Sequence, residues 1–168
     1  RSAGMLDIAK TGVLTAKGDL SLRAGSGAGS SGYGYSYGYA SSYGYSYGYS
    51  YGYGYGRYGR PSSSGINVAG KVESTNGSLY ANASGAMNIA QTGSLKAQKN
   101  LSISTGRNTD AVLTDLDENV GLNVAGAVES LTGSADVNSS GAVQLADTGS
   151  LKAQKNLSIA ASDVDNAG

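Results

Sequence analysis

Hydrophobic residues in this chain alternate with polar or small residues in short bursts. Residues 87–103 contain three of these bursts, MNI, SLKA and LSI, and Gly, Asn, Lys and Thr separate them. Alternation with a period of two indicates a strand with one buried face, and the separating residues favour turns. The pattern therefore predicts three short strands in about 20 residues.

The same bursts recur along the chain. The sequence TGSLKAQKNLSI occurs at 92–103 and again, unchanged, at 148–159, a spacing of 56 residues. A looser copy spans 6–22, and the phrase INVA at 66–69 returns as MNIA at 87–90. The chain thus reads as five turns of one spiral, which start near Leu6, Ile66, Met87, Leu122 and Val143. Three strands per turn favour a parallel β-helix, in which each strand pairs with its equivalent in the next turn, about 4.8 Å away.

Stacking these turns predicts a core of five columns, nearly all aliphatic. The columns are Leu6, Ile66, Met87, Leu122 and Val143; Ile8, Val68, Ile89, Val124 and Leu145; Leu14, Val72, Leu95, Val128 and Leu151; Leu20, Leu79, Leu101, Ala135 and Leu157; and Leu22, Ala81, Ile103, Val137 and Ile159. One turn alone cannot bury such a column, so the core depends on stacking. A spiral this narrow accounts for the absence of aromatic residues from the five interior columns.

Two turns carry long insertions, 24–65 and 105–121, which we expect to be corner loops within a single domain, 1–168. Both leave the spiral after the same strand, so they should emerge from the same edge, about two strand spacings or ~10 Å apart. The first is rich in Tyr and Gly and carries Arg57 and Arg60 without any acid. The second is acidic, and its acids are Asp110, Asp115, Asp117 and Glu118. Opposite charges at that distance predict attraction between the insertions or between neighbouring molecules.

Three phrases carry a resemblance to a known family: GAMNIA at 85–90, GSLKA at 93–97 and NLSI at 100–103. They resemble the haemagglutinin-type repeats of two-partner-secretion exoproteins, which include filamentous haemagglutinin and the contact-dependent inhibition proteins of Gram-negative bacteria. The resemblance covers the whole chain except the two insertions. It implies a right-handed β-helix that an outer-membrane partner exports and that is displayed at the surface or released. Both chain ends lie inside the repeat pattern, and we expect a segment of a longer protein.

The composition removes most kinds of chemistry. The chain has no Cys and no His, so thiolate chemistry and the usual neutral-pH base are absent. Its 12 basic and 12 acidic residues give no net field for nucleic acid, and no apolar run is long enough to span a membrane. The acidic phrase DLDEN at 115–119 lacks the spacing and the Gly of a calcium loop. We therefore expect no enzyme activity, no cofactor and no metal.

The aromatic residues are concentrated in the first insertion. Tyr alternates there with Gly, Ser or Ala, and ASS at 40–42 interrupts the rhythm. This stretch can be a Gly-rich tether, an ordered extended element with one phenolic face, or a sticker that binds glycans or its own copies. We favour the ordered element, which would lean on the β-helix or on a neighbouring molecule, because a lone hairpin is marginal in water. The predicted interaction residues are Tyr33, Tyr35, Tyr37, Tyr39, Tyr43, Tyr45, Tyr47, Tyr49, Tyr51, Tyr53, Tyr55, Tyr58, Arg57 and Arg60.

The sequence therefore favours a structural role. We expect a segment of a secreted or cell-surface fibre of a Gram-negative bacterium, with the Tyr/Gly-rich insertion mediating self-association. One alternative is an adhesin that binds a host, glycan or surface ligand through the insertion. The other is a passive stalk that carries a contact-dependent toxin.

Overall fold

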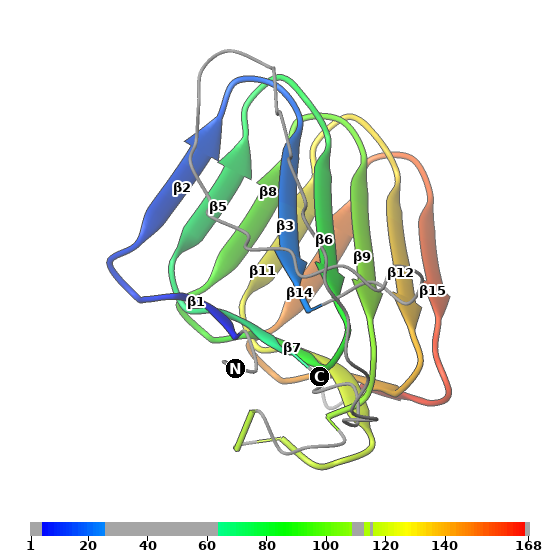
Figure 1. The fold of residues 1–168 in the computed structure, drawn as a ribbon. Coiled ribbons are helices and arrows are strands. Elements are labelled where there is room, and N and C mark those ends of the chain that lie inside the picture. The colour runs from blue at the N-terminus through cyan, green and yellow to red at the C-terminus, as the bar shows by residue number, and fades with distance from the viewer. Residues whose placement is uncertain (1–4, 26–63, 109–112, 115, 167–168) are drawn as a thin grey trace, which may run out of the picture.

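The chain winds through three parallel sheets in a fixed order, one strand of each sheet per turn. The computed structural model describes residues 5–25, 64–108, 113–114 and 116–166 (Figure 1). In Figure 1 the chain passes along the bottom of the spiral, up one side and down the other before it enters the next turn. The path is right-handed, as is general for crossovers between parallel strands. The predicted all-β parallel β-helix of about five turns is thereby confirmed.

Every strand is short, as the bursts predicted. Sheet A contains β1 (Leu6–Ile8), β4 (Ile66–Val68), β7 (Met87–Ile89), β10 (Val120–Val124), β13 (Ala142–Leu145) and β16 (Val164–Asn166). Sheet B contains β2 (Val13–Ala16), β5 (Lys71–Ser74), β8 (Ser94–Ala97), β11 (Ala127–Ser130) and β14 (Ser150–Ala153). Sheet C contains β3 (Leu20–Ala24), β6 (Leu79–Ala83), β9 (Leu101–Thr105), β12 (Ala135–Ser139) and β15 (Leu157–Ala160).

The strand register confirms all five predicted columns. In sheet A, for example, Leu6 pairs with Ile66, Ile66 with Met87 and Met87 with Leu122. In sheet B, Leu95 and Leu151 both pair with Val128. They therefore occupy equivalent positions with one turn between them, as the repeat requires.

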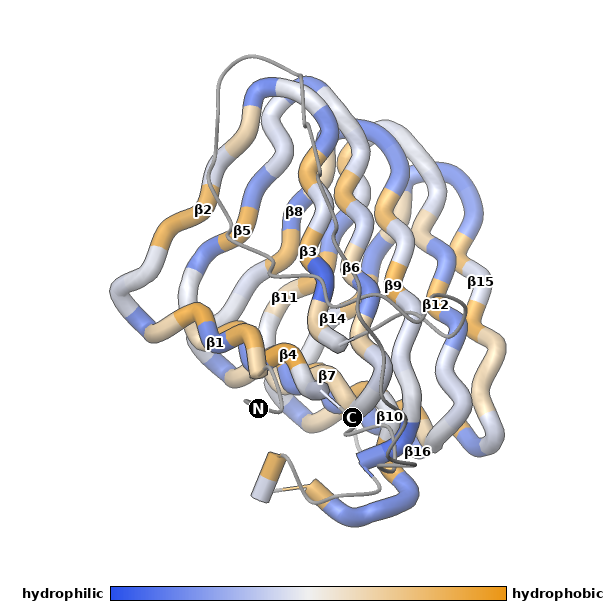
Figure 2. The backbone as a smooth tube through the Cα atoms, in the orientation of Figure 1, coloured by the Kyte–Doolittle hydropathy of each residue, from blue (hydrophilic) through white to orange (hydrophobic). Residues whose placement is uncertain are grey.

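Burial follows from stacking. Interior side chains of the middle turns, such as Met87 and Leu95, are fully buried at 0% exposure. Leu157 occupies an equivalent column position in the last strand of sheet C and is 47% exposed. A column member is covered from both sides only when it has a neighbouring turn above and below, so the interior positions open progressively toward the two end turns. Figure 2 shows the alternation of hydrophobic and hydrophilic positions along the strands.

Sequence reasoning missed one strand. β16 adds a sixth strand to sheet A, and its Val164 pairs with Val143. Val164 follows Val143 by the same 21 residues that separate Ile66 from Met87, so the repeat spacing contained a signal for it. The signal is weak because only one of the three residues of β16 is apolar.

The two insertions leave the spiral from the same edge, as predicted. Ala24 ends β3, Thr105 ends β9, and Ala83 of the intervening β6 pairs with both. The two departure points are therefore separated by two strand spacings. The proposed attraction between the insertions stays a prediction, because Arg57, Arg60, Asp110 and Asp115 lie outside the described residues.

The second insertion is more than a solvated acidic loop. The Nδ2 group of Asn108, which is 1% exposed, donates to the carbonyls of Leu113 and Leu116 at 2.8 Å each. Its Oδ1 accepts from the Leu113 amide at 3.1 Å. Leu113 is itself only 7% exposed, and an added Cβ at Gly65 would lie 3.3 Å from its Cγ atom. One buried amide thus folds this loop back against the return of the first insertion.

We expect Leu95→Asp to unfold the β-helix, because the substitution places an unpaired carboxylate in a column that has no polar partner. Leu95→Ala should cost about 2–5 kcal/mol through the cavity that it leaves. Urea unfolding followed by circular dichroism measures both effects. Ser94→Asp is the matched control, since Ser94 precedes Leu95 on the same strand and points outward. Equal stability of the two Asp variants would contradict the inward position of Leu95.

Candidate functional site

The interaction residues predicted from sequence fall in a part of the chain without a described structure. All twelve tyrosines of the first insertion, together with Arg57 and Arg60, lie within 26–63, outside the described residues. What the structure describes is the base of that insertion, the surface beside it and the outer faces of the three sheets.

The two ends of the first insertion meet at one residue, Ser84. The Ser84 amide donates to the Ala24 carbonyl at 3.0 Å, and its Oγ accepts from the Ser64 amide at 3.2 Å. Gly25 lies against the same side chain, because a Cβ added at Gly25 would lie 2.0 Å from Ser84 Oγ. Gly25 also has a φ of 88°, in the left-handed region that favours glycine. We call Gly25, Ser64 and Ser84 the insertion base.

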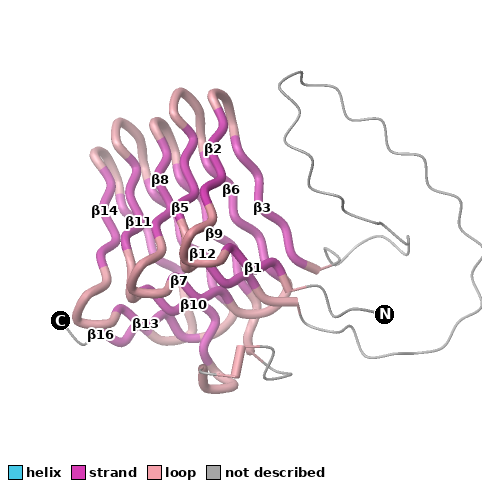
Figure 3. Tube along the Cα trace, turned by 90° about the vertical axis from the view of Figure 1, so that its left-hand side faces the viewer, coloured by secondary structure: helices cyan, strands magenta, loops and turns pink. Residues whose placement is uncertain are grey.

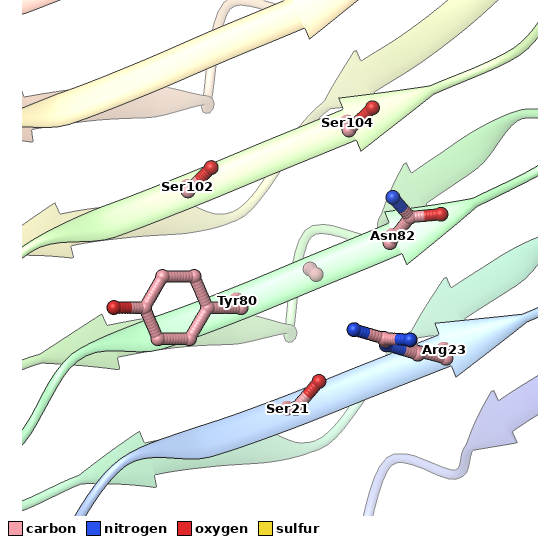
Figure 4. Close-up of a pocket in the computed structure, with 7 residues that line it drawn as sticks. Ser21, Arg23, Tyr80, Asn82, Ser102 and Ser104 are labelled. Carbon is pink, nitrogen blue, oxygen red and sulfur yellow. The ribbon is translucent and has the colours of Figure 1, made fainter.

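A recess of about 340 Å³ lies on the outer face of sheet C, where that insertion begins (Figure 4). Three neighbouring strands, β3, β6 and β9, form its floor. The recess is lined by Ser21, Arg23, Tyr80, Ala81, Asn82, Ser102 and Ser104. Its volume falls within the range of small-molecule sites, and its lining is mainly polar.

Tyr80 gives the recess its aromatic surface. It is 45% exposed, and it pairs with Ser21 on one side and Ser102 on the other, so small side chains flank its ring. Arg23 lies one outward position further along β3, paired with Asn82. In Figure 4 the Tyr80 ring lies toward one end of the recess and the Arg23 and Asn82 side chains toward the other. The ring can stack on a planar or sugar-like group, while the guanidinium and the amide hydrogen-bond its substituents. Sequence reasoning missed this site, although alternation within LYANA predicts that Tyr80 points outward.

The outer face of sheet A carries a ladder of side-chain amides. Asn67 donates from Nδ2 to Oδ1 of Asp7 at 2.8 Å, and Asn88 donates to Asn67 at 2.9 Å. Asn123 continues the ladder by donating to Asn88 at 2.8 Å. Each amide therefore donates toward the preceding turn, and the ladder ends on a carboxylate, where the hydrogen bond is charge-assisted. The ladder fixes the stacking register from outside the core, as amide ladders do in stacked sheets.

The outer face of sheet B carries charges. Lys96 and Lys152 pair with Glu129 from either side, and the Lys96 ammonium lies 3.4 Å from the Glu129 carboxylate. Lys71 lies 2.6 Å from Glu73. Its hydrogen bond to the carboxylate lowers the pKa of Glu73 below the usual value.

Two further features of the described ranges bear on function. No group of three or more acidic side chains comes together there as a set of metal ligands. The same ranges contain no helix of the length and hydrophobicity needed to cross a membrane.

No protein-family model, curated protein or solved structure matches this chain.

We expect Gly25→Ala to destabilise the protein by about 1–3 kcal/mol, because a Cβ there meets Ser84 and the residue must hold a positive φ. Gly18→Ala is the matched control, since an added Cβ at Gly18 meets nothing within 4 Å. The urea midpoint of each variant measures the difference. If the two variants had equal midpoints, the close approach of Gly25 to Ser84 would be wrong.

Asn88→Ala should cost about 1–2 kcal/mol, because it removes one hydrogen bond donated to Asn67 and one accepted from Asn123. Asn138→Ala provides the comparison, since Asn138 is an exposed asparagine on the outer face of sheet C. Thermal unfolding of both variants is the measurement. A larger loss of stability for Asn138→Ala would argue against the ladder.

Proposed function

We propose that this chain is a structural segment of a secreted or cell-surface fibre of a Gram-negative bacterium, and that its Tyr/Gly-rich insertion joins copies to one another. The β-helix is the scaffold and the insertion is the contact. Export through an outer-membrane partner belongs to the same proposal, and it rests on the resemblance of the repeats to those of two-partner-secretion exoproteins.

The observation that carries this proposal is the way the spiral closes beneath the insertion. β3 ends at Ala24 and β4 begins at Ile66, yet β1 pairs with β4, and β3 with β6, without any break in register. The insertion base holds the two ends of the insertion together over Ser84. A scaffold that is unchanged by so long an insertion is suited to presenting it outward.

The composition of the insertion supplies the kind of contact. No charged residue lies between Arg23 and Arg57, so the usual protection against edge-to-edge association is missing there. Alternation gathers the Tyr side chains of an extended segment on one face, opposite a face of Gly, Ser or Ala. Each buried Tyr pair adds about 0.5–1.5 kcal/mol beyond its buried area. Several pairs offset the ordering cost only when a partner surface repeats alongside.

The test replaces six tyrosines with serine: Tyr43, Tyr45, Tyr47, Tyr49, Tyr51 and Tyr53. The variant should keep the β-helix in circular dichroism, because none of these residues belongs to a column of the core. In about 300 mM salt, where exposed charge contacts are screened, it should lose self-association in sedimentation and its fibres in electron microscopy. If this variant assembles as well as the parent, the insertion is not the assembly element, and a passive stalk becomes the better description.

The recess on sheet C favours a second candidate, an adhesin for a glycan or another surface ligand. Tyr80 and Arg23 present a stacking surface and a cation beside the insertion. Tyr80→Ala should then abolish binding to the ligand, measured with glycan arrays and target cells, and leave assembly unchanged. Ser158→Ala, on the outer face of the same sheet but two strands away from the recess-lining β9, is the control. Equal binding by the Tyr80→Ala variant and the parent would remove this candidate.

A further inference from the structure

The outer face of sheet B carries a row of charges that alternate in sign. Strand pairing aligns Glu73 with Lys96, Lys96 with Glu129, and Glu129 with Lys152. The sign therefore reverses at every step of about 4.8 Å along the axis of the spiral. We call these four residues the charge row.

The second outward row of the same sheet is mostly small. Lys71 is followed by Ser94, Ala127 and Ser150 in register. From β8 onward, the long charged side chains of the charge row therefore project beyond the short side chains of this second row. Figure 3 faces this side of the spiral, and no other described element crosses it. A flat surface of this kind lets another sheet approach until the charged side chains meet.

The two central charges of the row are accessible and already paired along it, whereas Glu73 is 21% exposed and pairs with Lys71 on its own strand. Lys96 and Glu129 form an ion pair with side chains 36% and 40% exposed. An ammonium group has three donors and a carboxylate accepts at two oxygens, so each group of the pair can take a second partner. Because the pair already restrains both side chains, less rotamer freedom is lost when a partner arrives.

We propose that the outer face of sheet B binds the same face of a second copy of this chain, with the two β-helices antiparallel. The twofold axis runs parallel to the strands and passes between β8 and β11. Glu73 then faces the second copy's Lys152, and Lys96 faces the second copy's Glu129. The symmetry repeats each contact, so all eight charges of the two rows meet an opposite charge.

Other face-to-face arrangements match fewer charges. A twofold axis along the spiral and midway between the two rows sets the charge row against the second row. Only Glu73 then meets a charge, that of Lys71. The same axis through the charge row sets like charges opposite one another unless the copies slip by one turn. Of these arrangements, antiparallel docking is the one that places every charge of both rows opposite a charge of the other sign in a closed dimer.

The area buried by this contact is too small to hold two isolated copies together tightly, so we expect the contact to act between neighbouring fibres, where it is repeated many times. Five strands of about four residues cover on the order of 300 Å² per copy, below the ~800 Å² per partner of a stable complex. Such contacts become effective when many of them form together along neighbouring fibres. The inference deepens the proposed function, which supplies that array, but the charge row does not depend on the tyrosines.

The experiment uses the full chain with the six Tyr→Ser changes, so that tyrosine contacts do not mask the charge contact. Sedimentation equilibrium up to millimolar protein should detect a weak dimer in about 20 mM salt and lose it in about 300 mM, because added salt shortens the Debye length and weakens attraction between exposed charges. Lys96→Glu should lower the association constant at least about tenfold, because the symmetry places two contacts between carboxylates in the dimer. Glu129→Lys should do the same by creating two contacts between ammonium groups.

Two combinations test the geometry. An equimolar mixture of the Lys96→Glu and Glu129→Lys chains should regain association, because every facing pair is again opposite in sign. The double variant, with both substitutions in one chain, should also associate, since the antiparallel dimer sets the new carboxylate at position 96 against the new ammonium group at position 129. In a parallel arrangement slipped by one turn, the new carboxylate at position 96 would instead face Glu73, and association would be lost.

Lys99→Glu is the matched control, because Lys99 lies in the turn after β8, outside the charge row. It should change the association constant by less than about twofold. Absence of a dimer at low salt, insensitivity to Lys96→Glu, or loss of association in the double variant would each overturn the proposal. None of these results touches the tyrosine test, which compares the parent chain with its six-serine variant.

Discussion

The structure depends on one constraint: each strand pairs in register with the equivalent strand of the next turn. Pairing at a fixed spacing places like positions on top of one another, whatever the residue is. Inward positions therefore have to be aliphatic in every turn, which gives the columns through Met87 and Leu95. Outward positions become rows, and the chemistry of each row depends on what the repeat places there: amides on sheet A, alternating charges on sheet B, and hydroxyl and amide groups around Tyr80 on sheet C.

This constraint explains how much of the fold could be predicted from the sequence. Period-two alternation identified the strands, and the repeated phrases identified which strands are equivalent, so every column from Leu6 to Ile159 followed. The same reasoning overlooked β16, where Val164 is the one apolar residue of a short strand at the end of the spiral. It also treated the second insertion as an acidic surface loop, although Asn108 is buried there at 1% exposure. Contacts between a side chain and distant carbonyls leave no periodic trace in a sequence.

The candidate site was harder to predict than the fold. The low-complexity sequence marks the tyrosines as unusual. It does not predict where they lie, because the Tyr-Gly alternation contains no aliphatic position that matches an interior column of the spiral. Tyr80 illustrates the opposite case. It stands alone among the repeats, yet the alternation around it gives its direction. Asn82 is the next outward position on the same strand, and the pairing of β3 with β6 places Arg23 next to Asn82. A single aromatic residue on a periodic scaffold is therefore easier to place than twelve in an insertion.

The insertion base has a consequence for how such a protein can change. The spiral already holds Gly25 and Ser64 together at Ser84, so the ends of the insertion are fixed at contact distance whatever lies between them. The entropic cost of bringing the two ends of a loop together grows only logarithmically with its length, by about 0.6 kcal/mol for each doubling. Addition or loss of Tyr-Gly units would therefore change the entropy of closing the insertion very little. The insertion can therefore change in length while the insertion base and the scaffold beneath it stay the same.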